Sequence, residues 1–187
     1  MKSCVILVDN SNLFIEGMKF SAWDKGLVGG HDIEPTDSTW RLDFETLLEY
    51  LAEGRKIISA ILVSSSPPDS PDLWRAAERQ GFEVLVHERN SAGVEKGVDV
   101  HLAIIGTRLI HTMDLPPEQM CLVIASGDSD FQPLAEEAKR KGWQVELCSF
   151  SSAFNPRGKL AAAVDRVRLL DESFDLIGRY AISKVSQ

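Results

Sequence analysis

The chain has 187 residues, of which 44% are hydrophobic and 26% charged, the proportions of an ordinary globular protein. A chain of this length can bury a core of its own, so we expect one domain over residues 1–187. The 28 acidic residues outnumber the 20 Lys and Arg, and the net charge of −8 excludes broad electrostatic attraction to nucleic acid. A polyanionic partner would need a local basic groove or a bound cation.

The sequence predicts a soluble, cytoplasmic protein with no membrane partner. No apolar run approaches the roughly 20 residues that cross a bilayer. The opening MKSCVILVDN lacks the small-residue cleavage site of a signal peptide and is better interpreted as a first strand. Cys4, Cys121 and Cys148 are odd in number and have no CxxC spacing, which predicts neither a disulfide framework nor a zinc site.

Apolar, β-branched runs predict strands at 4–9, 57–65, 82–88, 121–126 and 143–150. The runs are nearly continuous, as in strands that are buried on both faces. Helical patterns lie between them at 43–54, 71–81, 98–113 and 131–142, and several end at glycine. This alternation predicts an α/β fold, a three-layer sandwich with a mainly parallel central sheet of about five strands.

Two parts of the chain fit this alternation less well. Residues 17–41 are rich in glycine and polar residues, and we expect a long irregular insertion there. This insertion could contact a protein partner. The extension 160–187 offers a short strand near 167–170 and a helix over 173–182. Such a helix, or an edge strand of the sheet, could pair with a second copy of the chain to form a homodimer.

Acidic residues follow the predicted strands at their carboxyl ends. Asp9 closes the run 4–9, and Asp128 and Asp130 come directly after the run 121–126. Ligands of open parallel sheets bind beyond these ends, so the carboxylates converge if the two strands are neighbours. Asp99 opens the predicted helix 98–113 and can lie at the same edge.

Converging carboxylates repel one another, and a divalent cation bound among them relieves this repulsion. The ligands would all be hard oxygens, which favours Mg²⁺ or Mn²⁺. An ion held in this way can activate water against a phosphodiester. The aspartates therefore offer a route to a nucleic acid substrate despite the negative net charge.

Asp130, Asp99 and two polar residues near the motifs, Asn12 and Lys96, also have purely structural interpretations. Asp130 could be an N-cap or first-turn acid, and Asp99 a first-turn acid. Asn12 could make an Asx turn. Lys96 could be a solvated flank rather than a partner of Asp99.

Aromatic residues and histidines carry weaker signals. Trp23 and Trp40 could stack on nucleobases, although isolated tryptophans more often pack locally. The four histidines show no metal-ligand spacing, which predicts surface or packing roles.

Three segments in order, VILVDNSNLF, EKGVDVHLA and LVIASGDSDFQPLAEEAKRKGWQVEL, resemble the NYN domain family of the PIN-like nuclease group, particularly its LabA-like bacterial branch. The resemblance covers a motif-bearing core of residues 4–150. It implies a PIN-like fold and a Mg²⁺- or Mn²⁺-dependent endoribonuclease acting on RNA. By motif it assigns catalysis to Asp9, Asp99, Asp128 and Asp130, metal binding to Asp9, Asp99 and Asp128, and contacts that support the site or the RNA to Asn12, Lys96 and Ser126.

The sequence departs from the family pattern at one place. Many members of the family carry a further acidic residue on the helix after the K-G-V-D-V motif, whereas residues 100–113 contain no carboxylate. A non-catalytic regulator that keeps this fold and binds RNA or a protein therefore remains an alternative. A phosphatase or small nucleotide hydrolase is a third alternative, because its active site would use the same chemistry as that of the nuclease.

Overall fold

The protein folds around one central parallel sheet. The structure, a computed structural model, describes residues 2–29, 34–65, 71–87 and 97–181. The sheet has six strands in the order β4-β3-β1-β5-β6-β7, and every neighbouring pair is parallel. The sixth strand is the short one expected near 167–170. The strands are β1 (Ser3–Asp9), β3 (Lys56–Ser65), β4 (Glu83–His87), β5 (Met120–Ala125), β6 (Gln144–Ser149) and β7 (Arg166–Leu169).

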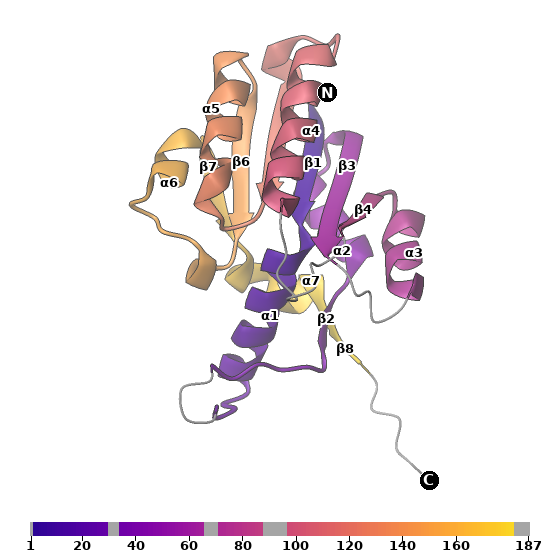
Figure 1. Cartoon of the computed structure of the whole chain (residues 1–187), viewed down its shortest axis with the longest axis vertical. Helices are drawn as coiled ribbons and strands as arrows, with labels where there is room; N and C mark the ends of the chain where they lie inside the picture. Colours follow the sequence, from indigo (N-terminus) through magenta and orange to yellow (C-terminus); the bar gives the residue numbers. More distant parts are fainter. Residues whose placement is uncertain (1, 30–33, 66–70, 88–96, 182–187) are drawn as a thin grey trace.

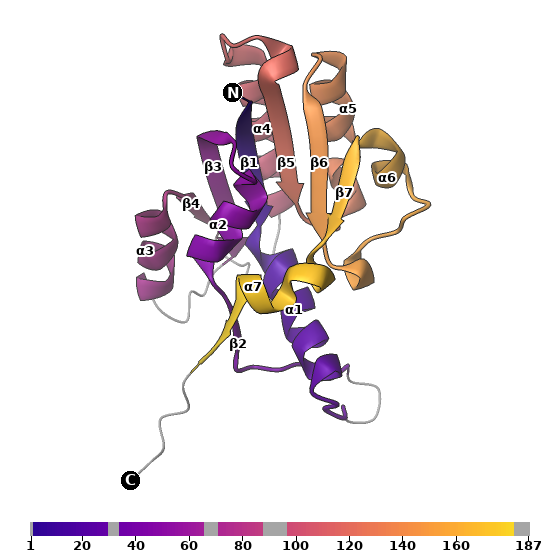
Figure 2. The same cartoon turned by 180° about the vertical axis from the view of Figure 1, so that it is seen from behind.

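Helices cover both faces of this sheet, which gives the expected three layers (Figures 1 and 2). One face packs against α4 (Val98–Thr112), α5 (Gln132–Arg140) and α6 (Lys159–Ala163). The other packs against α1 (Asn10–Asp24), α2 (Phe44–Ala52), α3 (Pro71–Gln80) and α7 (Phe174–Ile177). β1 and β5 are buried along their whole length, which explains their continuous apolar runs. Over the described ranges, no helix is both long and apolar enough to cross a membrane.

The stretch 17–41 is more regular than expected, because α1 begins directly after β1 and continues to Asp24. Gly17 interrupts the apolar pattern of this helix, yet it is buried where a Cβ would collide with the indole of Trp40. The described residues after α1 run without a helix to β2 (Trp40–Leu42). Tertiary packing on Trp40, which sequence periodicity does not report, therefore corrects the predicted boundary.

The expected helix over 173–182 is wrong beyond its first turn, and Ile182 lies outside the described residues. α7 ends at Ile177, and the chain continues as β8 (Gly178–Tyr180), which pairs antiparallel with β2. The Trp40 ring stacks on Phe174 with centroids 5.4 Å apart, and a Cβ on Gly178 would collide with the indole nitrogen. Glycine at this position lets the chain leave the helix and cross the indole closely.

Candidate functional site

The centre of the sheet brings two predicted motifs together. β1 lies between β3 and β5, so the strand order reverses there, with β3 and β4 on one side and β5 to β7 on the other. β1 and β5 pair in parallel up to Val8 and Ala125. Asp9 and Ser126 therefore emerge side by side from adjacent strands. This is the edge and the reversal point where ligands of such sheets bind.

Asp9 is held by hydrogen bonds from two segments. Its side chain is the N-cap of α1 and accepts the backbone N–H of Asn12 over 3.1 Å at Oδ1. Its Oδ2 accepts the hydroxyl of Ser126 over 3.2 Å. Asp9 is only 8% exposed and Ser126 is fully buried. Donors to the charged carboxylate thus offset much of its desolvation and fix its direction.

The turn after β5 is tied to the same cluster. The N–H of Gly127 donates to the side-chain carbonyl of Asn12 over 3.0 Å, and the N–H of Asp128 donates to Ser126 Oγ over 3.2 Å. Asp128 in turn caps the short 3₁₀ turn η2 (Ser129–Phe131) by accepting the N–H of Asp130 over 2.9 Å. Asp128 is therefore the cap in this pair, and Asp130 is an exposed first-turn acid.

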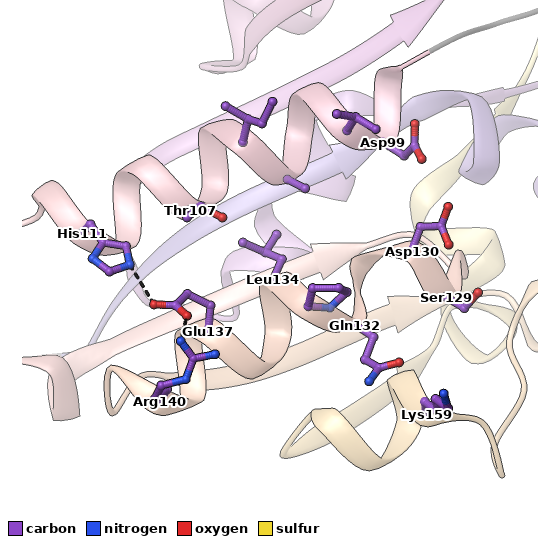
Figure 3. A pocket seen from close by; sticks show the side chains of 14 residues that line it. Asp99, Thr107, His111, Ser129, Asp130, Gln132, Leu134, Glu137, Arg140 and Lys159 are labelled. Carbon is purple, nitrogen blue, oxygen red and sulfur yellow. Dashed lines mark hydrogen bonds and ion pairs between the residues drawn. The ribbon is translucent and has the colours of Figure 1, made fainter.

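A cleft of about 1130 Å³ opens beside this turn, between α4 and α5. Asp99 from the first turn of α4 and Asp130 from η2 both line one end of it, and their carboxylates point into the same opening (Figure 3). Lys159, at the start of α6, lines that end as well. The cleft thus combines carboxylates with a lysine beside the carboxyl edge of the sheet.

The far end of the cleft carries a different set of charges (Figure 3). Glu137 of α5 pairs there with His111 Nε2 over 2.7 Å and with the Arg140 guanidinium. The hydrogen bond from His111, together with Arg140, holds the pKa of Glu137 below its ordinary value. This carboxylate is neutralised by its neighbours, which separates it from the aspartates at the other end.

The structure assembles most of the predicted site residues at one edge. Hydrogen bonds connect Asp9, Asn12 and the segment 126–130 in one chain. Asp99 is linked to them through the cleft that it shares with Asp130. Lys96 lies outside the described residues.

The donor chemistry of these residues suits a hard divalent cation, because the side chains offer carboxylate oxygens. In the described part of the chain, however, no three or more His, Cys, Asp or Glu side chains stand close enough to hold an ion. Both oxygens of Asp9 accept protein hydrogen bonds. The oxygen ligands are therefore of the type that such a cation binds, but the described residues do not form a complete ligand set.

Several further polar residues at this edge are not among the predicted site residues. Asn10 donates through Nδ2 to Ser64 Oγ over 3.2 Å, and both side chains are buried. A serine run at the end of the strand 57–65 was the available signal for Ser64. Lys159 had no motif signal, because α6 lies far along the chain from the aspartates. His87 and His101 also meet, with Nε2 and Nδ1 2.7 Å apart, although sequence spacing gave no sign of it.

The cysteines take no part in this edge. Burial raises the pKa of Cys121 and of Cys148 to about 12, and also raises that of Cys4. The thiols are therefore neutral near pH 7 and poor nucleophiles.

Comparison with known proteins agrees with the fold described above. A solved structure, the crystal structure of a protein of unknown function, VPA0982, from Vibrio parahaemolyticus RIMD 2210633, superposes with a TM-score of 0.66 at 18% identity. The match covers 92% of this chain and 95% of that one, and at this identity it shows the fold alone. No curated protein matches the sequence. The family model of the NYN domain matches residues 4–171, and the chain therefore belongs to the NYN domain family.

Proposed function

We propose that this protein is a Mg²⁺- or Mn²⁺-dependent endoribonuclease of the PIN-like group, in its LabA-like branch. Membership of the NYN family supports the nuclease class. The observation that carries the proposal is the hydrogen-bonded chain from Asp9 through Ser126 to Asp128 and Asp130, at the reversal point of the sheet. The cleft beside it, lined by Asp99 and Asp130, would give a single RNA strand access to these two carboxylates.

In this proposal, the residues of the candidate site have different roles. Asp9, Asp99 and Asp128 would hold the cation. When bound, such an ion neutralises charge on the phosphodiester and makes a bound water more acidic. Asp130 is exposed in the cleft, so it is placed to orient the attacking water or accept its proton. Asn12 and Ser126 position the turn, and Lys159 gives the cleft a cation for a phosphate of the RNA.

A non-catalytic regulator that binds RNA or protein is the second candidate. It is favoured by α4, on which the residues from Val100 to Thr112 include no carboxylate, and by the incomplete ligand set within the described ranges. The two functions share the fold and differ in whether RNA is cut.

The test is cleavage of an end-labelled single-stranded RNA by the purified protein with Mn²⁺, with Mg²⁺ and with EDTA. Asp128→Asn keeps an acceptor for the N–H of Asp130 and removes the charge, so it should fold and lose at least about a hundredfold in rate. Asp114→Asn, at an exposed position after α4, is the matched control and should cut like wild type.

The outcomes separate the candidates. Ion-dependent cutting that Asp128→Asn removes supports the nuclease. RNA binding without cutting by the cooperatively melting wild type supports the regulator. Hydrolysis of a chromogenic phosphoester with long RNA left intact indicates a phosphatase. Equal cutting by wild type and Asp128→Asn contradicts the proposed site.

A further inference from the structure

Trp23 lies on the surface of α1 with 72% of its area exposed. In contrast, Trp40 is fully buried and Trp143 is 5% exposed. The Trp23 ring rests against Phe20, with centroids 5.5 Å apart and planes tilted by 50°. The indole is thus in contact with a second aromatic ring. A large ring that contributes so little to the core offers a platform for a flat ligand.

A cavity of about 470 Å³ lies beside this ring. Its walls include Phe20 and Trp23 of α1, Pro35, and Ser151 and Ser152 of the short turn η3 (Ser151–Ala153). The volume falls in the roughly 300–1,000 Å³ range of small-molecule pockets. The cavity therefore has room for a planar group that stacks on Trp23.

One stripe of α1 connects this cavity to the candidate site. Asn12, Glu16, Lys19 and Trp23 follow the spacing i, i+4, i+7 and i+11, so they lie along one side of the helix. Asn12 binds the turn at Gly127, and Glu16 accepts the hydroxyl of Ser152 over 2.6 Å. The stripe is about 17 Å long at 1.5 Å per residue. A stacked strand covers that length in about five nucleotides at ~3.4 Å each.

The polar groups of the cavity suit a nucleobase better than a phosphate. Lys19 is paired with Glu16 over 3.0 Å and with Glu34 over 2.9 Å. Asp171, also in the wall, accepts the N–H and hydroxyl of Ser151. The carboxylates would repel a phosphate but can accept from the exocyclic amino group of a base. Adenine, which carries such a group and stacks well, fits this combination.

We propose that the Trp23 cavity is a base-stacking subsite for single-stranded RNA, filled by a nucleotide about five stacked positions from the aspartates. This inference rests on the proposed function, because it needs RNA at the carboxyl edge of the sheet. The strand would pass over the turn after β5 and η3, which bind Asn12 and Glu16 on this side of α1. Bases that carry an amino group should be preferred there over uracil.

The experiment measures binding of fluorescein-labelled oligoadenylates of three and eight nucleotides by anisotropy, in the uncleaving Asp128→Asn background. Trp23→Ala should weaken binding of the octamer roughly tenfold, because stacking on an aromatic side chain contributes about 1–3 kcal/mol per base. Trp23→Phe should restore most of it. A trimer bound at the aspartates is too short to reach the cavity, so Trp23→Ala should weaken its binding less than that of the octamer. Val28→Ala, at a 95% exposed apolar position outside the cavity, is the control.

Each result bears on one proposal separately. If Trp23→Ala binds the octamer as tightly as its parent, the subsite is wrong, whether or not wild type cuts RNA. If binding depends on Trp23 but wild type cuts nothing, the subsite stands and the nuclease proposal fails. If no oligoadenylate binds, the subsite is overturned. If Trp23→Ala instead turns a dimer into a monomer in light scattering with RNA binding unchanged, the indole is a protein contact and the subsite is wrong.

Discussion

The hydroxyl of Ser126 donates to Oδ2 of Asp9 over 3.2 Å, at the junction where β1 and β5 end side by side. Ser126 Oγ also accepts the N–H of Asp128 over 3.2 Å. A single fully buried side chain thus joins the carboxylate of one strand to the turn that follows its neighbour. The relative position of Asp9 and Asp128 depends on this serine.

Ser126→Ala should therefore affect both stability and chemistry. It removes the donor to a carboxylate that is 8% exposed and the acceptor for one N–H. We expect a loss of about 2 kcal/mol in the free energy of unfolding, because buried groups left without partners cost about 1–3 kcal/mol. The rate of RNA cleavage should fall at a temperature where the variant is folded. Urea unfolding and cleavage assays measure the two effects.

Ser149→Ala is the matched control for this prediction. Ser149 is also fully buried at the end of a strand, but its hydroxyl donates to the carbonyl of Phe150. It should lose less stability than Ser126→Ala and keep full cleavage. Equal behaviour of the two variants would mean that the bond to Asp9 has no special effect.

Gly127→Ala tests the contact between the turn and η3. A Cβ on Gly127 would collide with the backbone carbonyl of Ala153, so one segment must move. Overpacking of this kind costs about 1–3 kcal/mol. We expect a lower melting temperature and slower cleavage, because the N–H of Gly127 also holds Asn12. Wild-type stability and activity in Gly127→Ala would show that η3 can move away from residue 127 without disturbing the site.

The meeting of Asp9 with the turn 126–130 was predictable from the sequence. Continuous apolar runs indicate parallel strands, and the ends of parallel strands share one edge. The pairing of Ser126 with Asp9 then needs only that β1 and β5 be neighbours, which strand order decides. The hydrogen-bond direction within the Asp128 and Asp130 pair was not predictable, because either could cap the turn.

Other parts of the structure depend on contacts that have no local signature. The sequence of α1 from Gly17 onward shows no clear helical period, because Gly17 faces Trp40. Glu16 and Lys19, which pair with each other, are polar on the side where Glu16 binds η3. β8 exists because Gly178 lies against the same indole. Both boundaries follow from packing on one distant tryptophan, which periodicity does not encode.

Glu146→Gln tests a buried ion pair outside the site. Glu146 is 7% exposed and accepts from Arg55 over 2.9 and 3.0 Å, and it lies 3.3 Å from Arg168. Removal of its charge takes this counter-ion from Arg168 and leaves Arg55 with the weaker contact to Glu53 at 3.6 Å. We expect a loss of about 3 kcal/mol in urea unfolding, near the value for broken buried pairs. Cleavage by the folded variant should stay at the wild-type rate.

Glu53→Gln is the control for the buried pair. Its carboxylate pairs mainly with Arg166, where the side chains are 44% and 50% exposed, and has a longer contact of 3.6 Å with Arg55. Exposed pairs contribute about 0–1 kcal/mol. Equal losses for Glu53→Gln and Glu146→Gln would contradict the importance assigned to burial.

Asp37 anchors the segment between α1 and β2 and makes its stability depend on pH. Its carboxylate is 5% exposed and accepts from Lys25, from Ser21 and from Thr39. Burial acts to raise the pKa of Asp37, but these hydrogen bonds outweigh it and hold the pKa well below its ordinary value. A carboxyl whose pKa is lowered by folding stabilises the protein above its unfolded pKa, about 3.9 for aspartate.

Asp37→Asn should therefore be less stable than wild type at pH 7, by about 2 kcal/mol for the charged hydrogen bonds that it weakens. The gap should stay constant down to about pH 4 and narrow below it, because the wild-type carboxyl then begins to take up a proton on unfolding. Urea midpoints at pH 7, 5 and 3.5 measure this. Asp24→Asn, at an exposed position at the end of α1, should show a small gap at every pH. A gap for Asp37→Asn that is as large at pH 3.5 as at pH 7 would show that the charge of Asp37 does not stabilise the fold.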